Sequence, residues 1–186
     1  MNQQTGSEIA KRLSPFAIVD VHYEGDEATA ACVVAADWGD ETGVEERVVR
    51  VSGVQEYRPG AFYERELPCL VAVLALVKRQ VRAIVVDGYV ELDAQGAPGL
   101  GAHVHSHFGG ATPVIGVAKT SFRGSGFAVS VVRGASKSPL FVTARGVGAE
   151  EAARLVRGMH GSHRLPTLIK RVDSLARGLS APSERG

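Results

Sequence analysis

The sequence predicts an α/β fold in which helices cover a mixed β-sheet. Three strand-like segments with interleaved polar residues come first, and turn residues alone separate them, as in an antiparallel meander. Further along, helical segments alternate with short apolar runs that are typical of strands buried on both faces. Helices bury their apolar faces against a sheet, so these segments together indicate one mixed sheet flanked by helices.

The first part of the chain predicts one helix and the three strands of the meander. Residues 1–13 form the expected helix, with Ser7 as its N-cap. The strands are expected at residues 15–23, 28–38 and 46–54. The sequences EGDE and WGDETG lie between them and contain the residues that tight turns prefer.

The rest of the chain predicts alternating helices and strands. Residues 67–80 have apolar side chains at helical spacing, and Pro68 suits a first turn, where no backbone N–H is needed. Two amphipathic helices are expected at the end of the chain. The four strands are expected at residues 82–88, 113–119, 126–132 and 139–144, and the last two helices at residues 148–160 and 166–178.

Length and composition indicate one domain over residues 1–180, followed by a disordered tail over residues 181–186. The net charge of +1 means that any nucleic-acid site must be a local patch. Cys32 and Cys69 lie in apolar segments, so we expect reduced, buried thiols. No signal segment opens the sequence and no apolar run reaches about 18 residues. We therefore expect a cytoplasmic protein with no membrane partner.

Two acidic residues follow apolar runs of matching character. Asp20 ends FAIVD, and Asp87 ends AIVVD. An ionised carboxylate beside a buried sheet is costly unless a cation pairs with it, so two such strands suggest a shared cation. The simpler interpretation is that each aspartate begins a turn, for which Asp87–Gly88 is a good dipeptide.

A third acid is expected on the helix that follows the meander. Glu66 lies one turn before Leu70 and shares its inward face, whereas Glu64 points roughly the opposite way. We therefore expect Glu66 to face the sheet and Glu64 to face solvent. Three carboxylates are the hard oxygen donors that suit Mg²⁺, with Mn²⁺ as a substitute. Such sites hydrolyse phosphodiesters.

The motifs resemble those of the endonuclease V family, which nicks nucleic acid beside deoxyinosine or inosine and has a ribonuclease H-like fold. YRPGAFYERELP resembles the family's Tyr-Ile-Pro-Gly segment and the Phe-Arg-Glu that follows it. VVDG, PVIGVAKTSFRG and HRLPTLIKRVDSLAR resemble its Val-Asp-Gly, Pro-Thr-Ile-Gly-Val-Ala-Lys and Arg-Leu-Pro-Glu-Pro motifs. The resemblance runs from about residue 15 to residue 177, and the order and spacing of the motifs carry it.

The resemblance implies roles for single residues. Asp20, Glu66 and Asp87 fall on the family's metal-binding carboxylates, and Lys119 falls on its active-site lysine. Tyr57 falls on the tyrosine of the wedge that separates the strands. Each also has an alternative without a functional role. Tyr57 could be a turn tyrosine packed on the helix, and Lys119 could be a lysine that reaches water at a strand end. The residues expected at the nucleic acid and the lesion are Tyr57, Arg58, Pro59, Gly60, Gly88, His103 and Arg123, with Arg65 and Lys119 as further backbone contacts.

The sequence also departs from the family. Gly146 stands where the family has a histidine in a Ser-Pro-Gly-His turn, a residue that lies near the metal and assists catalysis. The histidine of the family's Gly-Leu-Ala-Ser-His motif matches either His103 or His107. In an extended segment, His103, His105 and His107 would share one face and could bind a transition metal, whereas a helix start or loop would leave only one packed.

The expected function is a Mg²⁺-dependent endonuclease acting on inosine-containing DNA or RNA, in repair or RNA processing. Two alternatives remain. One is a homologue that binds nucleic acid and cleaves poorly because the histidine is missing. The other is a nuclease of the same fold with a different substrate. The sequence leaves open the choice between DNA and RNA, the choice between inosine and other lesions, and the oligomeric state.

Overall fold

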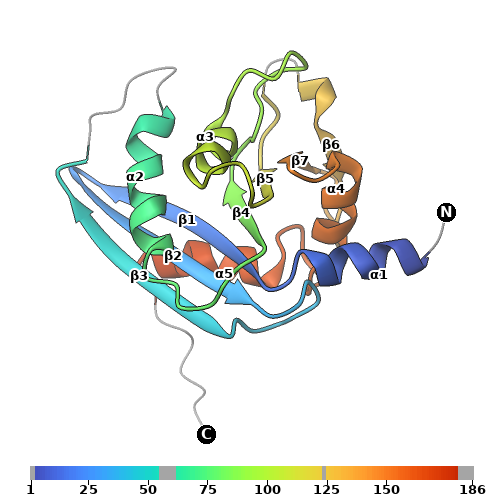
Figure 1. The fold of residues 1–186 in the computed structure, drawn as a ribbon, viewed down its shortest axis with the longest axis horizontal. Coiled ribbons are helices and arrows are strands. Elements are labelled where there is room, and N and C mark those ends of the chain that lie inside the picture. Colours follow the sequence, from blue (N-terminus) through green and yellow to red (C-terminus); the bar gives the residue numbers. More distant parts are fainter. Residues whose placement is uncertain (1–2, 55–61, 123–124, 180–186) are drawn as a thin grey trace, which may run out of the picture.

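The computed structural model describes residues 3–54, 62–122 and 125–179. A seven-stranded sheet runs through the molecule in the order β3-β2-β1-β4-β5-β7-β6 (Figure 1). Helices lie on both sides of it, which confirms the predicted α/β class with a mixed sheet. The elements are α1 (Gln3–Arg12), β1 (Phe16–Glu24), β2 (Glu27–Ala35), β3 (Glu45–Ser52), α2 (Phe62–Leu74), β4 (Ala83–Asp87), α3 (Leu100–His107), β5 (Val114–Ala118), a 3₁₀ turn η1 (Ser125–Phe127), β6 (Val129–Val131), β7 (Leu140–Arg145), α4 (Ala149–Gly158) and α5 (Thr167–Ala176).

The first three strands form the predicted antiparallel meander, with β2 between β1 and β3. β4 then pairs with β1 in parallel, and β5 pairs with β4 in parallel. β7 and β6 continue the sheet in antiparallel fashion. The carboxyl ends of β4 and β5 therefore lie at the same edge of the sheet, beside the middle of the longer β1.

Two hydrophobic cores fill the spaces between the sheet and its helices. On one face, α2 and α3 cover side chains such as Val19, Val34 and Val86. On the other face, α1, α4 and α5 cover side chains such as Ile18 and Val85. Neighbouring strand residues thus contribute to opposite cores, as the alternation of side chains along a strand requires.

Several local predictions need correction. Ser7 lies inside α1 and not at its cap. α2 begins at Phe62, so Pro68 lies in its second turn. The sequence did not predict α3 as an element, and because the segment is helical, the extended arrangement of His103, His105 and His107 is wrong. β6 is a short strand at the sheet edge and is only partly buried.

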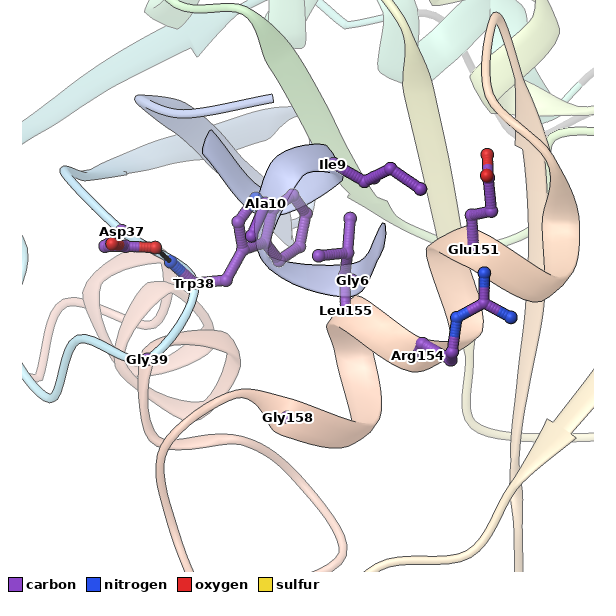
Figure 2. Close-up of a pocket in the computed structure, with 10 residues that line it drawn as sticks. All are labelled: Gly6, Ile9, Ala10, Asp37, Trp38, Gly39, Glu151, Arg154, Leu155 and Gly158. Carbon is purple, nitrogen blue, oxygen red and sulfur yellow. Dashed lines mark hydrogen bonds between the residues drawn. The ribbon is translucent and has the colours of Figure 1, made fainter. Parts of the chain in front are cut away.

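Figure 2 shows a pocket of about 290 Å³ that lies between α1, the β2–β3 loop and α4. Trp38 lines it and stacks on Phe16 with ring centroids 3.9 Å apart. Arg154 and Glu151 on α4 lie at one side of the pocket. None of its lining residues belongs to the acid-lined pocket described below. Among the described helices, none has the length and apolar character needed to cross a membrane.

Candidate active site

Asp20 and Asp87 lie side by side on adjacent strands. The parallel pairing of β1 and β4 ends at Val19 and Val86, and each aspartate is the next residue on its strand. Neighbouring strands lie about 4.8 Å apart, so the two backbones deliver their carboxylates to one place. Oδ1 of Asp20 accepts a hydrogen bond from the backbone N–H of Val21 at 2.8 Å. Asp20 and Asp87, which the two apolar runs placed at similar positions, are thus neighbours in the sheet.

Glu66 reaches the same place from α2, on one side of the sheet. Glu66 is buried, with only 8% of its surface exposed to solvent, whereas Glu64 is exposed. Cys69 and Leu70, one turn further along, are buried in the core, which explains why this face of the helix turns inward. The predicted contrast between an inward Glu66 and a solvated Glu64 is confirmed.

The acids line a pocket of about 280 Å³, hereafter the acid pocket. Lys119 follows β5 directly, and its Nζ lies 2.6 Å from Oδ2 of Asp87 and 3.8 Å from Oδ1 of Asp173. Arg177 contacts the same Asp173 through Nε to Oδ2 at 3.0 Å and Nη2 to Oδ1 at 3.3 Å. The lining residues are Asp20, Val21, His22, Phe62, Glu66, Asp87, Lys119, Asp173 and Arg177.

Asp173 and Arg177 are site residues that sequence reasoning missed. They lie on and just after α5, whose buried residues Ile169 and Val172 face the sheet. Asp173 is four residues after Ile169, so it continues the apolar face of the helix. A carboxylate on the inward face of an amphipathic helix was the signal that could have revealed it.

Burial and mutual repulsion dominate the electrostatics of the acid pocket. Burial, followed by the charge of Asp87, raises the pKa of Asp20 to about 7. Burial, followed by the charges of Asp20 and Asp87, raises the pKa of Glu66 to about 8. For Asp173, burial alone would raise the pKa, but the hydrogen bonds from Arg177 and the charge of Lys119 outweigh it and lower the pKa. Full ionisation of Asp20 and Glu66 therefore calls for additional positive charge.

The donor set of the acid pocket fits a hard divalent cation. Asp20, Glu66, Asp87 and Asp173 offer only carboxylate oxygens, the ligands that Mg²⁺ prefers, and burial followed by neighbouring carboxylates raises the pKa values of Asp20 and Glu66. Among the described residues, however, no three such side chains already stand in a metal-binding arrangement. Asp87 is paired with Lys119, so the acids would have to turn toward a common point.

A second pocket, of about 360 Å³, adjoins the acid pocket and shares Phe62 and Asp87 with it. We call it the aromatic pocket. The hydroxyl of Tyr89 fixes one wall, since it donates to the carbonyl of Thr120 at 2.9 Å and accepts from the N–H of Phe122 at 3.2 Å. The lining residues are Phe62, Tyr63, Asp87, Gly88, Tyr89, Leu92, Pro98, Gly99, Leu100 and Phe122.

The expected lesion contacts fall into two groups. Gly88 lines the aromatic pocket, and His103 on α3 stacks on its lining residue Tyr63, with ring centroids 3.5 Å apart. His107 is exposed and makes an edge contact with Phe108. Arg65, a further predicted backbone contact, lies over the ring of Tyr23, with its Cζ 3.9 Å from the ring centroid. Five other predicted contacts lie outside the described residues, so their roles stay predictions: Tyr57, Arg58, Pro59, Gly60 and Arg123.

Backbone packing holds the strand ends in position. A side chain at Gly116 would place its Cβ 2.5 Å from the carbonyl oxygen of Gly88 and 2.8 Å from the backbone nitrogen of Val90. Glycine therefore lets the chain that leaves Asp87 cross closely over β5. Arg164, in the α4–α5 loop, donates to the carbonyl of Lys119 and, at 2.9 Å, to that of Pro139. This contact ties the loop before α5 to the end of β5.

The expected position of Gly146 beside the acids is wrong. β7 runs antiparallel to β5, with Arg145 opposite Val114, so Gly146 lies at the start of β5, whereas Lys119 follows its end. Six residues of strand span about 20 Å. Gly146 has a φ of +81°, and its Cβ would lie 3.1 Å from Cα of Pro113. The loss of a histidine at this position is therefore not a loss at the acid pocket.

Comparison with solved structures supports the fold. The structure is similar to human endonuclease V, with a TM-score of 0.76 and 20% identity, covering 95% of this chain and 89% of the human one. It is also similar to Ciona intestinalis endonuclease V (D234N) in complex with a DNA containing an inosine followed by a ribo-adenosine. There the TM-score is 0.75 at 18% identity, with 94% of this chain and 93% of the other covered.

Sequence comparison gives the family. Endonuclease V of Xanthomonas campestris pv. campestris strain 8004 is 32% identical over 149 residues, covering 76% of this chain and 58% of that protein. The Xanthomonas oryzae pv. oryzae PXO99A protein is 36% identical over 114 residues, covering 57% and 44%. The chain thus spans about half the length of these relatives. The sequence model of the endonuclease V family matches residues 2–142, and the chain belongs to that family.

Proposed function

We propose that this chain is a Mg²⁺-dependent endonuclease that hydrolyses a phosphodiester in inosine-containing nucleic acid. The observation that carries the proposal is the convergence of Asp20, Glu66, Asp87 and Lys119 on one pocket, from two parallel strands, a helix and a strand end. A cluster of carboxylates with raised pKa values beside a lysine suits metal-assisted hydrolysis of an anionic ester.

The acids and the lysine of the acid pocket have distinct roles in this proposal. Asp20, Glu66 and Asp87 would hold Mg²⁺ or Mn²⁺, and Asp173 lines the same pocket. The bound ion would supply the positive charge that favours attack by water and departure of the leaving oxygen. Lys119, whose ammonium lies between Asp87 and Asp173, would stabilise negative charge that develops on the phosphoryl group.

The aromatic pocket provides a place for the altered base. A base taken out of its stack needs a pocket with apolar or aromatic walls, and Phe62, Tyr89 and Phe122 provide them here. The two pockets share Asp87, so a base in one would bring its own backbone to the acids in the other. Tyr57 keeps its predicted role beside the displaced base. The substrate is DNA or RNA, and we place the enzyme in the cytoplasm.

The test is cleavage of labelled strands that differ only in one inosine, as DNA and as RNA, with Mg²⁺, with Mn²⁺ or with EDTA. We expect cleavage of the inosine strands with either metal and none with EDTA. Glu66→Gln should remove the activity, and Glu64→Gln should keep it. Equal cleavage of inosine and control strands would indicate a nuclease with another substrate. Cleavage in EDTA would contradict the proposed metal dependence.

A second candidate is a member of the family that binds nucleic acid without cleaving it. The observation that favours it is the pairing of Asp87 with Lys119, together with the lack of a ready metal arrangement among the described acids. Binding of inosine strands without cleavage at any metal concentration would make this the better account.

A further inference from the structure

The acid pocket poses an electrostatic problem for its substrate. Four carboxylates line it, from Asp20, Glu66, Asp87 and Asp173, and a phosphodiester carries a further negative charge. Two permanent cations, Lys119 and Arg177, stand among the described lining residues. A strand that enters the metal-free pocket therefore needs a positively charged group whose hydrogen-bond donors still have room for a phosphate oxygen.

Lys119 is largely committed to the protein. Its Nζ lies 2.6 Å from Asp87 and 3.8 Å from Asp173, and its side chain is 32% exposed. Arg177 is placed differently. Its side chain is 50% exposed, and Asp173 engages one edge of the guanidinium through Nε and Nη2. Among the described residues, Nη1 has no hydrogen-bond partner, so its donors can reach a ligand at the mouth of the pocket.

The bidentate contact with Asp173 orients this guanidinium. A fork of two hydrogen bonds fixes the plane of an arginine, which a single contact does not do. Because Asp173 lies on α5 and Arg177 follows its end, the helix itself sets the distance between them. An arginine so oriented can contact phosphate oxygens with little further loss of side-chain freedom.

We propose that Arg177 binds a phosphate oxygen of the nucleic-acid strand that enters the acid pocket, and that Asp173 holds the guanidinium in position. This inference rests on the proposed function. The competing explanation is that Arg177 only neutralises Asp173. The two explanations predict different nucleic-acid binding when the charges of both Asp173 and Arg177 are removed. If Arg177 only neutralises Asp173, binding recovers, because Asp173 no longer carries a charge. If Arg177 contacts a phosphate, that contact stays lost and binding stays weak.

The experiment measures the dissociation constant of a single-stranded inosine oligonucleotide in EDTA, by fluorescence anisotropy, at several salt concentrations from about 50 to 200 mM. Each phosphate contact contributes roughly 0.7 to the slope of log K against log salt for a single strand, so Arg177→Gln should lower the slope by about that amount. Arg177→Lys keeps the charge and should bind with nearly the wild-type slope. Arg154→Gln is the matched control, since Arg154 is exposed and lines the separate pocket of Figure 2.

The double variant Asp173→Asn with Arg177→Gln separates the two explanations. We expect its binding to stay weak and its slope to stay shallow. Recovery to the wild-type values would overturn the inference in favour of simple neutralisation. An unchanged slope in Arg177→Gln, or an equal fall in Arg154→Gln, would also overturn it and would leave the nuclease proposal intact. Failure of the wild-type protein to bind any strand would overturn the proposed function, and this inference with it.

Discussion

Nζ of Lys119 lies 2.6 Å from Oδ2 of Asp87, although the β5 residue opposite Asp87 is Val117 and Lys119 follows two residues later, just past the end of β5. The lysine thus holds an oxygen that a divalent cation would also use. Burial opposes its charge, but the hydrogen bond and the charge of Asp87 outweigh that effect and raise the pKa of Lys119. It stays charged at neutral pH, so cation and lysine compete for one carboxylate.

Lys119→Met should affect metal binding and cleavage in opposite directions. Methionine keeps the aliphatic stem and removes the charge, so Asp87 becomes available and the pocket becomes more negative. We expect Mn²⁺ to bind more tightly in a calorimetric titration. Single-turnover cleavage of an inosine strand should slow by roughly 10²-fold, because a stabilising charge is lost. Weaker Mn²⁺ binding in this variant would contradict the competition.

Glu66→Gln and Glu64→Gln form a matched pair on one helix. Only the first changes a buried carboxylate of the acid pocket. We expect Glu66→Gln to reduce the single-turnover rate by about 10³-fold or more, the scale of losing an essential group, and Glu64→Gln to stay within about threefold of wild type. Circular dichroism should show that both variants are folded. Similar losses of rate in the two variants would contradict a specific role for Glu66 in the reaction.

The metal-free protein should lose stability as the pH rises from about 4 to about 8. Unfolded aspartate and glutamate titrate near pH 4, whereas the pKa values of folded Asp20 and Glu66 are about 7 and about 8. Between these limits the folded state binds more protons than the unfolded state, so the free energy of unfolding falls with pH and levels off above about pH 8. Asp173, with its lowered pKa, acts the opposite way and only in the acid range.

The measurement is the melting temperature in EDTA across this pH range. A total effect of a few kcal/mol corresponds to a fall of roughly 5–10 °C for a chain of this size. The double variant Asp20→Asn with Glu66→Gln should show a flatter profile. Mg²⁺ should raise the melting temperature more at pH 8 than at pH 5, because the ionised acids bind it. A flat wild-type profile would contradict the raised pKa values.

Gly146→His should not accelerate cleavage, although a sequence alignment alone would suggest that it restores the family's histidine. The residue has a left-handed backbone, and its Cβ would press against Pro113. We expect a loss of about 1–2 kcal/mol of stability, measured by urea unfolding. Gly146→Asn is the control, since asparagine tolerates this backbone better. A faster single-turnover rate for Gly146→His would show that a side chain at position 146 affects the reaction at the acid pocket.

The sequence predicted the strands well because their signals are local. Continuous apolar runs and alternation mark β1, β4 and β5, and the two aspartates stand out as polar residues directly after such runs. Glu66 was also predictable, because its spacing from Leu70 fixes the face of the helix. What these positions share is that one segment of chain contains the whole signal.

Other features depend on contacts between distant segments, and one segment of sequence gives at most an indirect signal of them. Asp173 becomes a site residue only because α5 packs across β1, which places it near Lys119 from another part of the chain. The misplacement of Gly146 has the same origin. Its neighbours along the sequence indicated the end of a strand, but only the antiparallel register shows which edge of the sheet that end occupies. Helix α3 was missed because its glycine and three histidines are weak helix formers, a low propensity that tertiary packing overrides.

Gly116 also bears on how this protein can change. Its missing side chain leaves room for the carbonyl of Gly88, so any mutation at 116 transmits a push to the residue next to Asp87. A randomised library over residues 114–119 should therefore return glycine at 116 even under selection for folding alone, whereas lysine at 119 should return only under selection for nuclease activity. Residues 114–119 would thus distinguish selection for folding from selection for activity. A lineage that has lost catalytic activity would be expected to keep the glycine long after it has lost the lysine.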